Sequence, residues 1–511
     1  MTVLSRGQLS VAYFFVTIML VQLGRQGTNA WLSNGVAKLS LPGTQNHHAK
    51  AAVSVGRLFS WTAAADDTVK VPAKFVSYPF GYRQEIEIRI DTLTNRGWGI
   101  GRLPLDPELL SVVNEESTDV EQEEGSTSKW VIMVPNVVPG ELVKVAIFRN
   151  FKSYSEADLV EILEPSADRV EPLCPLAQEC GGCQLQHMSI EAQRHWKTVS
   201  VEEGLAQYGL SPKVEPALGT DEIYGYRSKL TPHFQAPSRR KRGVSKPGPA
   251  SIDAIGFQKQ TSRQIIDVPS CPIATPPINN RYASLRYELL SQPTDRKKGA
   301  TLLLRQGNLQ DEDVTTDHKS FLTTTVRGLN FQYLAGNFFQ NNLHVVPLMV
   351  DHVVEQAVGG GGMTHLADCY CGSGLFAVSA AAHFDTCVGI EINDKAVEEA
   401  TANAARNNIT NCMFVASKAE GIFDEIQDFP RDTTAVVLDP PRKGCSPEFL
   451  QQLYEFRPRR IVYMSCDPTT QARDAEGIVG AGYSIVTVQP FDLFPQTRHI
   501  ECLMILERND V

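Results

Sequence analysis

The sequence predicts an α/β protein in three parts: an all-β segment, a mixed segment, and a carboxyl-terminal parallel sheet covered by helices. Three observations carry this prediction. Strands of alternating polarity recur between residues 84 and 164. Short apolar runs between residues 364 and 465 alternate with helical patterns, as in a parallel sheet. A glycine-rich turn, Cys371 to Gly374, joins the first of these runs to a helix.

Length and composition narrow the class of protein. A chain of 511 residues has room for roughly two to four domains with large cores. The net charge of −10 argues against a uniformly basic nucleic-acid binder, although local patches decide binding. Of the eleven cysteines, four lie in one region and the others are scattered in the α/β part. This distribution favours a reducing compartment with a metal site over a disulfide scaffold.

Residues 1–80 are excluded from the predicted fold because they are similar to a targeting presequence. Residues 1–65 contain no Asp or Glu, and Val11–Leu23 is an apolar run of thirteen residues, short for a membrane span but suited to a signal-peptide core. Thr28-Asn29-Ala30 fits a cleavage site. An acid-free region after such a core resembles the two-part presequences of plastids with extra membranes. We expect an organellar protein without stable membrane association, in a plastid rather than a mitochondrion, and a cytoplasmic one if this segment is no presequence.

The all-β segment, residues 84–164, predicts a small barrel. Ile86–Ile90 alternates in polarity, Gly97–Gly101 is a turn that needs open backbone angles, and three further strands follow. The segment is similar to the oligonucleotide-binding barrel called the TRAM domain, and barrels of this size commonly bind nucleic acid. The acidic run Asn114–Glu124 would repel phosphate, so we expect a solvated loop that faces away from RNA.

Four cysteines form a candidate metal site in the mixed segment, residues 170–334. Cys174, Cys180 and Cys183 lie in a C-x5-C-x2-C arrangement, and Cys271 is the natural fourth ligand. Four thiolates suit an iron–sulfur cluster, and zinc accepts the same ligands. The spacing leaves the choice between iron and zinc open.

The mixed segment also combines aromatic and cationic residues. Tyr224–Lys229 and Ile255–Lys259 contain rings that can stack on bases and charges that can meet phosphates, as recognition of single-stranded or loop RNA requires. Ser238–Gly243 is a basic loop, for which RNA contact and a solvated loop are alternative interpretations.

The carboxyl-terminal domain, residues 335–511, has the pattern of a Rossmann-like fold. Asn337–Asn342 is expected to open a helix. The glycine turn lets a ligand approach the backbone closely, and the next strand ends in Glu391, where an acid accepts the ribose hydroxyls of a nucleoside. The turn alone is a weak signal that dinucleotide folds share.

Three strand ends bring reactive side chains to one edge of the predicted sheet. Asp439 ends a buried strand in the motif Asp-Pro-Pro-Arg-x-Gly, and sixteen residues later Ile-Val-Tyr-x-Ser-Cys ends in Cys466. Asp-x-Phe-Pro-x-Thr-x-His-x-Glu then delivers Glu501 to a third strand. Ligands of open α/β sheets bind at the carboxyl ends of the strands, so the thiol is a candidate nucleophile.

With these motifs, residues 84–507 resemble the S-adenosylmethionine-dependent RNA (uracil-5-)-methyltransferase family, in both its tRNA and its large-subunit-rRNA branches. The resemblance implies a class I methyltransferase domain, a flipped target base and RNA as partner. The family usually has Asn where this chain has Asp467. Its cysteine-rich branch carries a [4Fe–4S] cluster on the motif Cys174 to Cys271, which favours iron over zinc. We expect a monomer.

The resemblance also assigns roles to residues. S-adenosylmethionine would be held by Gln340, Tyr370, Glu391 and Asp439. Cys466 would add to carbon 6 of uracil, and Glu501 would remove the proton from carbon 5.

Two alternatives come from other classes. A catalytically silent RNA-binding protein could keep this fold, but the intact Cys466 and Glu501 argue against it. An RNA cytosine-5-methyltransferase also uses a cysteine, but such enzymes resemble a different set of motifs. The iron–sulfur motif leans toward the rRNA branch, whereas tRNA enzymes share the catalytic motifs, so the sequence leaves the substrate RNA open.

Overall fold

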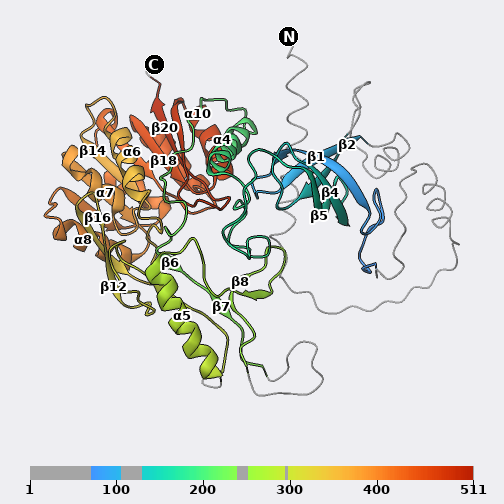
Figure 1. Ribbon diagram of the computed structural model, residues 1–511. Coiled ribbons are helices and arrows are strands. Elements are labelled where there is room, and N and C mark those ends of the chain that lie inside the picture. The colour runs from blue at the N-terminus through green and yellow to red at the C-terminus, as the bar shows by residue number, and fades with distance from the viewer. Residues whose placement is uncertain (1–70, 105–128, 239–250, 294–296, 510–511) are drawn as a thin grey trace, which may run out of the picture. The chain divides into compact units, whose positions relative to one another are not determined.

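The structure is a computed structural model that describes residues 71–104, 129–238, 251–293 and 297–509 (Figure 1). The predictions of a presequence, an acidic loop and a basic loop fall almost entirely on residues 1–70, 105–128 and 239–250, which lie outside the described residues. The described chain forms two compact units. The first holds the residues up to Glu164, except Asp91–Gly99 and Asn136–Glu141, which belong with the second.

The first unit is a closed five-stranded barrel with its strands in the order β1-β2-β3-β5-β4, which confirms the predicted small barrel. The turn predicted at Gly97–Gly101 is shorter than expected, because strand β2 already begins at Gly99. Alternate residues point inward, so that Ile88, Ile132 and Val145 are almost completely buried. Its strands are β1 (Glu85–Leu93), β2 (Gly99–Pro104), β3 (Lys129–Val134), β4 (Leu142–Asn150) and β5 (Tyr154–Glu164).

The second unit is built on a seven-stranded sheet with the order β16-β15-β14-β17-β18-β20-β19. β14 to β18 pair in parallel, and β20 runs antiparallel between β18 and β19. The strands are β14 (His365–Cys369), β15 (Thr386–Glu391), β16 (Cys412–Ala416), β17 (Thr434–Leu438), β18 (Arg460–Ser465), β19 (Tyr483–Phe491) and β20 (Glu501–Arg508). The helices are α6 (Val346–Val358), α7 (Leu375–Ala380), α8 (Asp394–Arg406), α9 (Pro447–Phe456) and α10 (Pro468–Gly480), with short 3-10 helices at Ala381–His383, Ala419–Ile426 and Arg431–Thr433.

Helices cover both faces of this sheet. On one face α9 and α10 share a hydrophobic core with α4 (Ile190–Ala206), which lies beside α10 in Figure 1. On the other face α6, α7 and α8 contribute Met349, Val378 and Ala404 to a second core. Because α4 comes from the segment 170–334, the two parts predicted as central and catalytic domains lie together in one compact unit.

The rest of the segment 170–334 consists of one more helix and short strands. The hairpin of β12 and β13 leads directly into the glycine-containing loop before α6. The elements are α5 (Pro276–Ser291), β6 (Lys229–Leu230), β7 (His233–Phe234), β8 (Ile255–Gln258), β9 (Ile265–Asp267), β10 (Ala300–Thr301), β11 (Leu304–Arg305), β12 (Phe321–Val326) and β13 (Leu329–Leu334). No helix in the described part of the chain combines the length and apolar character needed to cross a bilayer.

The helix expected to open at Asn337–Asn342 starts later. Residues 337–342 form a loop, and α6 begins at Val346. The side chain of Asn342 explains the delay, because its Oδ1 accepts hydrogen bonds from the backbone N–H groups of His344 (3.1 Å) and Val345 (3.4 Å). Asn prefers such capping positions to helix interiors. Residues 337–341 therefore stay outside the helix and line a cavity.

A buried ion pair ties α4 to the loop that precedes β20. Asp492 is fully buried, and its Oδ1 lies 2.5 Å from Nζ of Lys197, while its Oδ2 lies 3.5 Å from Nε of Arg194. Lys197 also donates to the carbonyl of Phe494 at 3.1 Å. Gln193 and Gln496 exchange reciprocal hydrogen bonds of 3.0 and 2.8 Å. The conformation of residues 492–496 therefore depends on α4.

We expect Lys197→Met to lower the free energy of unfolding by about 3–5 kcal/mol, because the Asp492 carboxylate would remain buried without its closest cation. Urea denaturation of the full chain measures this loss. Lys213→Met is the matched control, since Lys213 is 80% exposed where it pairs with Glu215 at 2.7 Å. Its loss should stay below about 1 kcal/mol. Equal losses in the two variants would contradict the structural role of the buried pair.

Candidate active site

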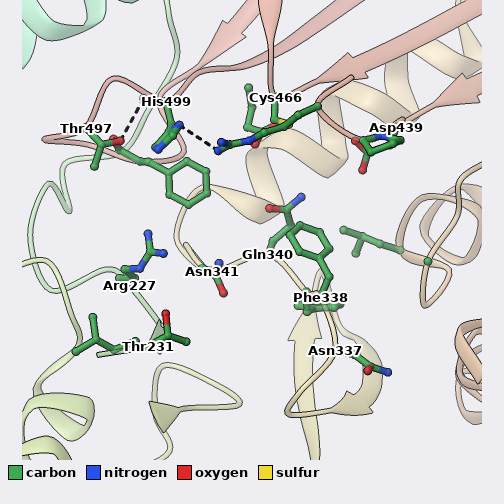
Figure 2. Close-up of a pocket in the computed structure, with 18 of the residues that line it drawn as sticks. Arg227, Thr231, Asn337, Phe338, Gln340, Asn341, Asp439, Cys466, Thr497 and His499 are labelled. Carbon is green, nitrogen blue, oxygen red and sulfur yellow. Dashed lines mark hydrogen bonds between the residues drawn. The ribbon is translucent and has the colours of Figure 1, made fainter. Parts of the chain in front are cut away.

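A cavity of about 1110 Å³ opens at the carboxyl edge of the parallel strands. Its walls come from residues following β14, β15, β17 and β18, from the first residue of β20, and from the loop before α6. Figure 2 shows Cys466 and Asp439 on one side of this cavity, with Gln340 and Phe338 pointing toward them. The edge predicted from the strand pattern is therefore where the cavity lies.

Strand register brings the three predicted reactive groups together. Asp439 directly follows β17, Cys466 directly follows β18, and Glu501 is the first residue of β20. β18 and β20 pair antiparallel with Ser465 opposite Cys502. One step further along this register sets Cys466 opposite Glu501. All three side chains line the cavity, as predicted.

Burial perturbs the acid–base properties of all three groups. It raises the pKa of the Cys466 thiol to about 11, with a further increase from the Glu501 carboxylate. It raises the pKa of Glu501 to about 8, with Asp439 adding to the increase, and that of Asp439 to about 7. Desolvation disfavours the anionic forms of these three groups, and it favours the protonated thiol at neutral pH.

Arg442 is the cation that opposes these increases. It follows the two prolines of the Asp-Pro-Pro-Arg motif, and it lowers the pKa of both Cys466 and Glu501. Its Nη2 lies 3.3 Å from Nδ1 of His499, and its carbonyl accepts a hydrogen bond from Thr470 at 3.1 Å. Sequence reasoning assigned Arg442 no role, although its place in the motif beside Asp439 was the available signal.

His499 stays neutral in this setting. Burial and the nearby cations, Arg498 and Arg442 foremost, lower the pKa of His499 to about 3. A neutral imidazole can accept the hydrogen bond from Arg442. The histidine of the His-x-Glu motif therefore orients the arginine that faces the thiol.

The departure at Asp467 does not disturb the local hydrogen bonds. Asp467 is the N-cap of α10, and its Oδ1 accepts from the N–H of Thr469 at 3.1 Å. Its own N–H donates to Oγ of Ser465, also at 3.1 Å. Asn and Asp are nearly equivalent N-caps, so the change from the family's usual Asn preserves the turn that carries Cys466.

The predicted cofactor residues lie around the same cavity. Tyr370 has a positive φ of 66°, unusual for a residue with a side chain, and begins the turn that continues through Gly372. Glu391 receives hydrogen bonds from the N–H groups of Gly372 (3.2 Å) and Asn393 (3.0 Å). This fixes the carboxylate at the end of β15, where a nucleoside ribose would find an acceptor.

Gln340 completes this set. It is 6% exposed and lines the cavity, and Figure 2 shows its side chain pointing toward Cys466 and Asp439. An amide that faces a cavity can both donate to and accept from a polar ligand. The donors and acceptors of Gln340, Glu391 and Asp439 together fit the amino acid and ribose groups of a cofactor such as S-adenosylmethionine.

The four predicted metal-ligating cysteines also line the cavity. Burial raises the pKa of Cys183 to about 12 and that of Cys271 to about 11, and other thiols of the set add to both increases. Within the described residues, however, no group of three or more His, Cys, Asp or Glu is arranged to hold a metal ion. The cluster predicted on Cys174, Cys180, Cys183 and Cys271 stays a prediction.

The strand order, the glycine turn and the cavity at the carboxyl edge define a class I methyltransferase domain. Comparison with known proteins shows which family of methyltransferases this chain resembles. The family model for tRNA (uracil-5-)-methyltransferases matches residues 303–509. The tRNA (uracil(54)-C(5))-methyltransferase of Schizosaccharomyces pombe is 37% identical over 449 residues, covering 84% of this chain and 79% of that protein. The Saccharomyces cerevisiae enzyme of the same name is 31% identical over 444 residues, covering 74% of this chain and 69% of that protein.

This chain belongs to the RNA (uracil-5-)-methyltransferase family. A solved structure supports its fold: the Pyrococcus abyssi tRNA (uracil-54, C5)-methyltransferase in complex with S-adenosyl-L-homocysteine is 22% identical, with a TM-score of 0.59 over 82% of this chain and 100% of that one. The family membership confirms the resemblance drawn from the motifs around Asp439, Cys466 and Glu501, and it favours uridine over the cytosine alternative.

We expect Arg442→Gln to slow alkylation of Cys466 by iodoacetamide, because loss of the cation raises the thiol pKa further. Each unit of increase lowers the thiolate fraction about tenfold. Mass spectrometry of the peptide that contains Cys466, across a pH series, measures the rate. Arg442→Lys, which keeps the charge, should fall between the wild type and Arg442→Gln. An unchanged rate in Arg442→Gln would show that the arginine does not act on the thiol.

Proposed function

We propose that this RNA (uracil-5-)-methyltransferase acts on tRNA and forms 5-methyluridine with Cys466 as nucleophile and Glu501 as base. The observation that carries the proposal is the register of β18 and β20, which sets thiol and carboxylate opposite each other in one cavity. The choice of tRNA, and of a uridine equivalent to position 54, is supported by the names of the two yeast relatives.

The chemistry of uracil explains why a thiol is needed. Carbon 5 of uracil is a poor nucleophile, and a Cys466 thiolate that adds to carbon 6 turns the ring into an enolate with nucleophilic carbon 5. S-adenosylmethionine, when bound, supplies an electrophilic methyl group. Glu501 then takes the proton from carbon 5, the carbon–sulfur bond breaks, and the thiolate leaves. Asp439 lies beside both groups and can face the polar edge of the base.

The state of Glu501 suits this role. A carboxyl with a pKa of about 8 holds a proton more readily than an ordinary glutamate, and hence is a stronger base when ionised. Arg442 keeps part of the population ionised at neutral pH, because it opposes the increase in the pKa of Glu501. The target base must leave its stack to reach this buried pair, which implies base flipping.

The cofactor would be held by Gln340, Tyr370, Glu391 and Asp439. Glu391 would accept hydrogen bonds from the ribose hydroxyls, and the turn after Tyr370 would allow close approach to the backbone. The buried Oδ1 of Asp368 has no hydrogen-bond partner within the described residues, although Oδ2 accepts from the N–H of Ala377 at 2.9 Å. Asp368 is completely buried and is not among the residues that line the cavity, so this cost belongs to the turn itself.

We expect purified protein with S-adenosylmethionine and an unmodified tRNA transcript to yield 5-methyluridine, detected by mass spectrometry of nucleosides. Cys466→Ala should abolish the product, because no thiol remains to activate the ring. An rRNA transcript is tested in parallel. Product in rRNA but not in tRNA would overturn the substrate assignment, and no product in either would favour the silent RNA-binding alternative.

Glu501→Gln separates the base from the nucleophile in the same assay. Without a base the thiol adduct cannot resolve, so a covalent protein–RNA species should accumulate on denaturing gels. This species should be missing in the double variant with Cys466→Ala.

We further propose that Cys174, Cys180, Cys183 and Cys271 hold a [4Fe–4S] cluster, with zinc as the alternative. The proposal is supported by the ligand spacing and by the thiols lining one part of the cavity. The fit is incomplete, because no group of three or more His, Cys, Asp or Glu in the described part of the chain is arranged to hold a metal ion. No catalytic step is assigned to it.

We expect anaerobically purified protein to contain iron and acid-labile sulfide and to absorb near 400 nm, and Cys180→Ser to lose most of both. Cys412→Ser, outside the motif, is the control and should keep the metal. Zinc without sulfide would support the alternative, and protein free of both metals would refute the proposal.

A further inference from the structure

Side chains of helix α8 form a row of hydrogen bonds with the backbone of β13, in the place where a neighbouring strand would otherwise pair. Residues one helical turn apart on α8 accept the N–H groups of alternate residues of β13. The pairs are Asn407 with Asn330 (2.8 Å), Asn403 with Gln332 (2.8 Å) and Glu399 with Leu334 (3.1 Å). The two asparagines also return a hydrogen bond to the carbonyls of Asn330 and Gln332.

The last hydrogen bond of this row, between Glu399 and Leu334, lies where the chain reaches the cavity. Oε1 of Glu399 accepts from Leu334 and also from Nδ2 of Asn337, at 2.8 Å. Leu334 ends β13, and Asn337 opens the loop that carries Gln340. Glu399 therefore holds the first half of the loop from the side of α8, the helix that follows Glu391.

Arg305 holds the same loop by hydrogen bonds to its carbonyl groups. It is fully buried, and its guanidinium donates to the carbonyls of Ala335 (3.1 Å), Asn337 (2.5 Å) and Phe339 (3.1 Å). It also lies over the ring of Tyr333, 4.7 Å from the centroid. Within the described residues it makes no ion pair, and its Nε has no partner. Burying a guanidinium charge without an ion pair is unfavourable, so its hydrogen bonds must compensate. Here these bonds fix three alternate carbonyl groups of one loop.

We infer that Arg305 and Glu399 are positioning residues that fix loop 335–340 so that Gln340 faces the cofactor cavity. The inference rests on the proposed role of Gln340 in holding S-adenosylmethionine. Glu399 also lines the cavity, and its Oε1 is engaged by the N–H of Leu334 and by Asn337. Each acts on the backbone from which Gln340 projects. Removing either one takes away hydrogen bonds that fix the path of the loop, while Phe339 still packs on Tyr333 and keeps the loop near the sheet.

Binding of S-adenosyl-L-homocysteine, measured by calorimetry on the full chain without RNA, tests this. Glu399→Ala should weaken binding on the order of tenfold, because the loop loses two hydrogen bonds on that side. Glu399→Gln keeps an oxygen acceptor and should stay within about twofold of the wild type. Arg305→Lys, which cannot reach three carbonyls, should weaken binding as Glu399→Ala does.

Asn407→Ala is the matched control, because it removes the same kind of backbone bonds at the far end of the row. It should lower the melting temperature about as much as Glu399→Ala but leave ligand affinity unchanged. Equal weakening by Asn407→Ala, or wild-type affinity in Glu399→Ala, would overturn the inference. Gln340→Ala separates the role of Gln340 in cofactor binding from the positioning of the loop. If Gln340→Ala keeps full affinity while Glu399→Ala and Arg305→Lys lose it, the assignment of Gln340 fails but the positioning of the loop stands.

Discussion

The burial of the Asp492 carboxylate is the constraint on which the active site depends. Its charge lies where water does not reach, and Lys197 and Arg194 of α4 supply the compensating cations. The same contact fixes α4 on the helical layer and sets the start of the loop that ends at Glu501. Two acids of one short motif thus have opposite tasks, because Asp492 is paired and structural while Glu501 faces the cavity.

Crowding of acids is the second constraint. Asp439 and Glu501 share a desolvated cavity with the Cys466 thiol, and each anion disfavours the next. The thiol and both carboxyl groups therefore have raised pKa values, and only a nearby cation limits the increase. Arg442, oriented by a neutral His499, is placed to do this for both thiol and carboxylate. Such opposed effects are how one site can supply both a nucleophile and a base.

The sequence predicted the barrel, the parallel strands and the meeting of Asp439, Cys466 and Glu501, because strand periodicity and strand ends are local properties of the chain. It did not predict that α4 packs beside α10, or that Asn337–Asn342 is a loop. Those features depend on contacts between distant residues, such as Arg305 with the carbonyl of Phe339, which leave no periodic trace in the sequence.

The pairing register of β18 and β20 brings these strand-end residues together into one site. In a purely parallel sheet a strand after β18 would begin at the opposite edge, and its first residue would lie far from Cys466. The antiparallel β20 reverses this, so that its first residue, Glu501, meets the residue after the last of β18. A slip by one residue would exchange the side chains that β20 places in the two cores, Met504 on one face and Leu503 and Ile505 on the other, and both close-packed cores would have to repack. The hydrophobic core of the sheet therefore sets the alignment of thiol and base, several residues away from either of them.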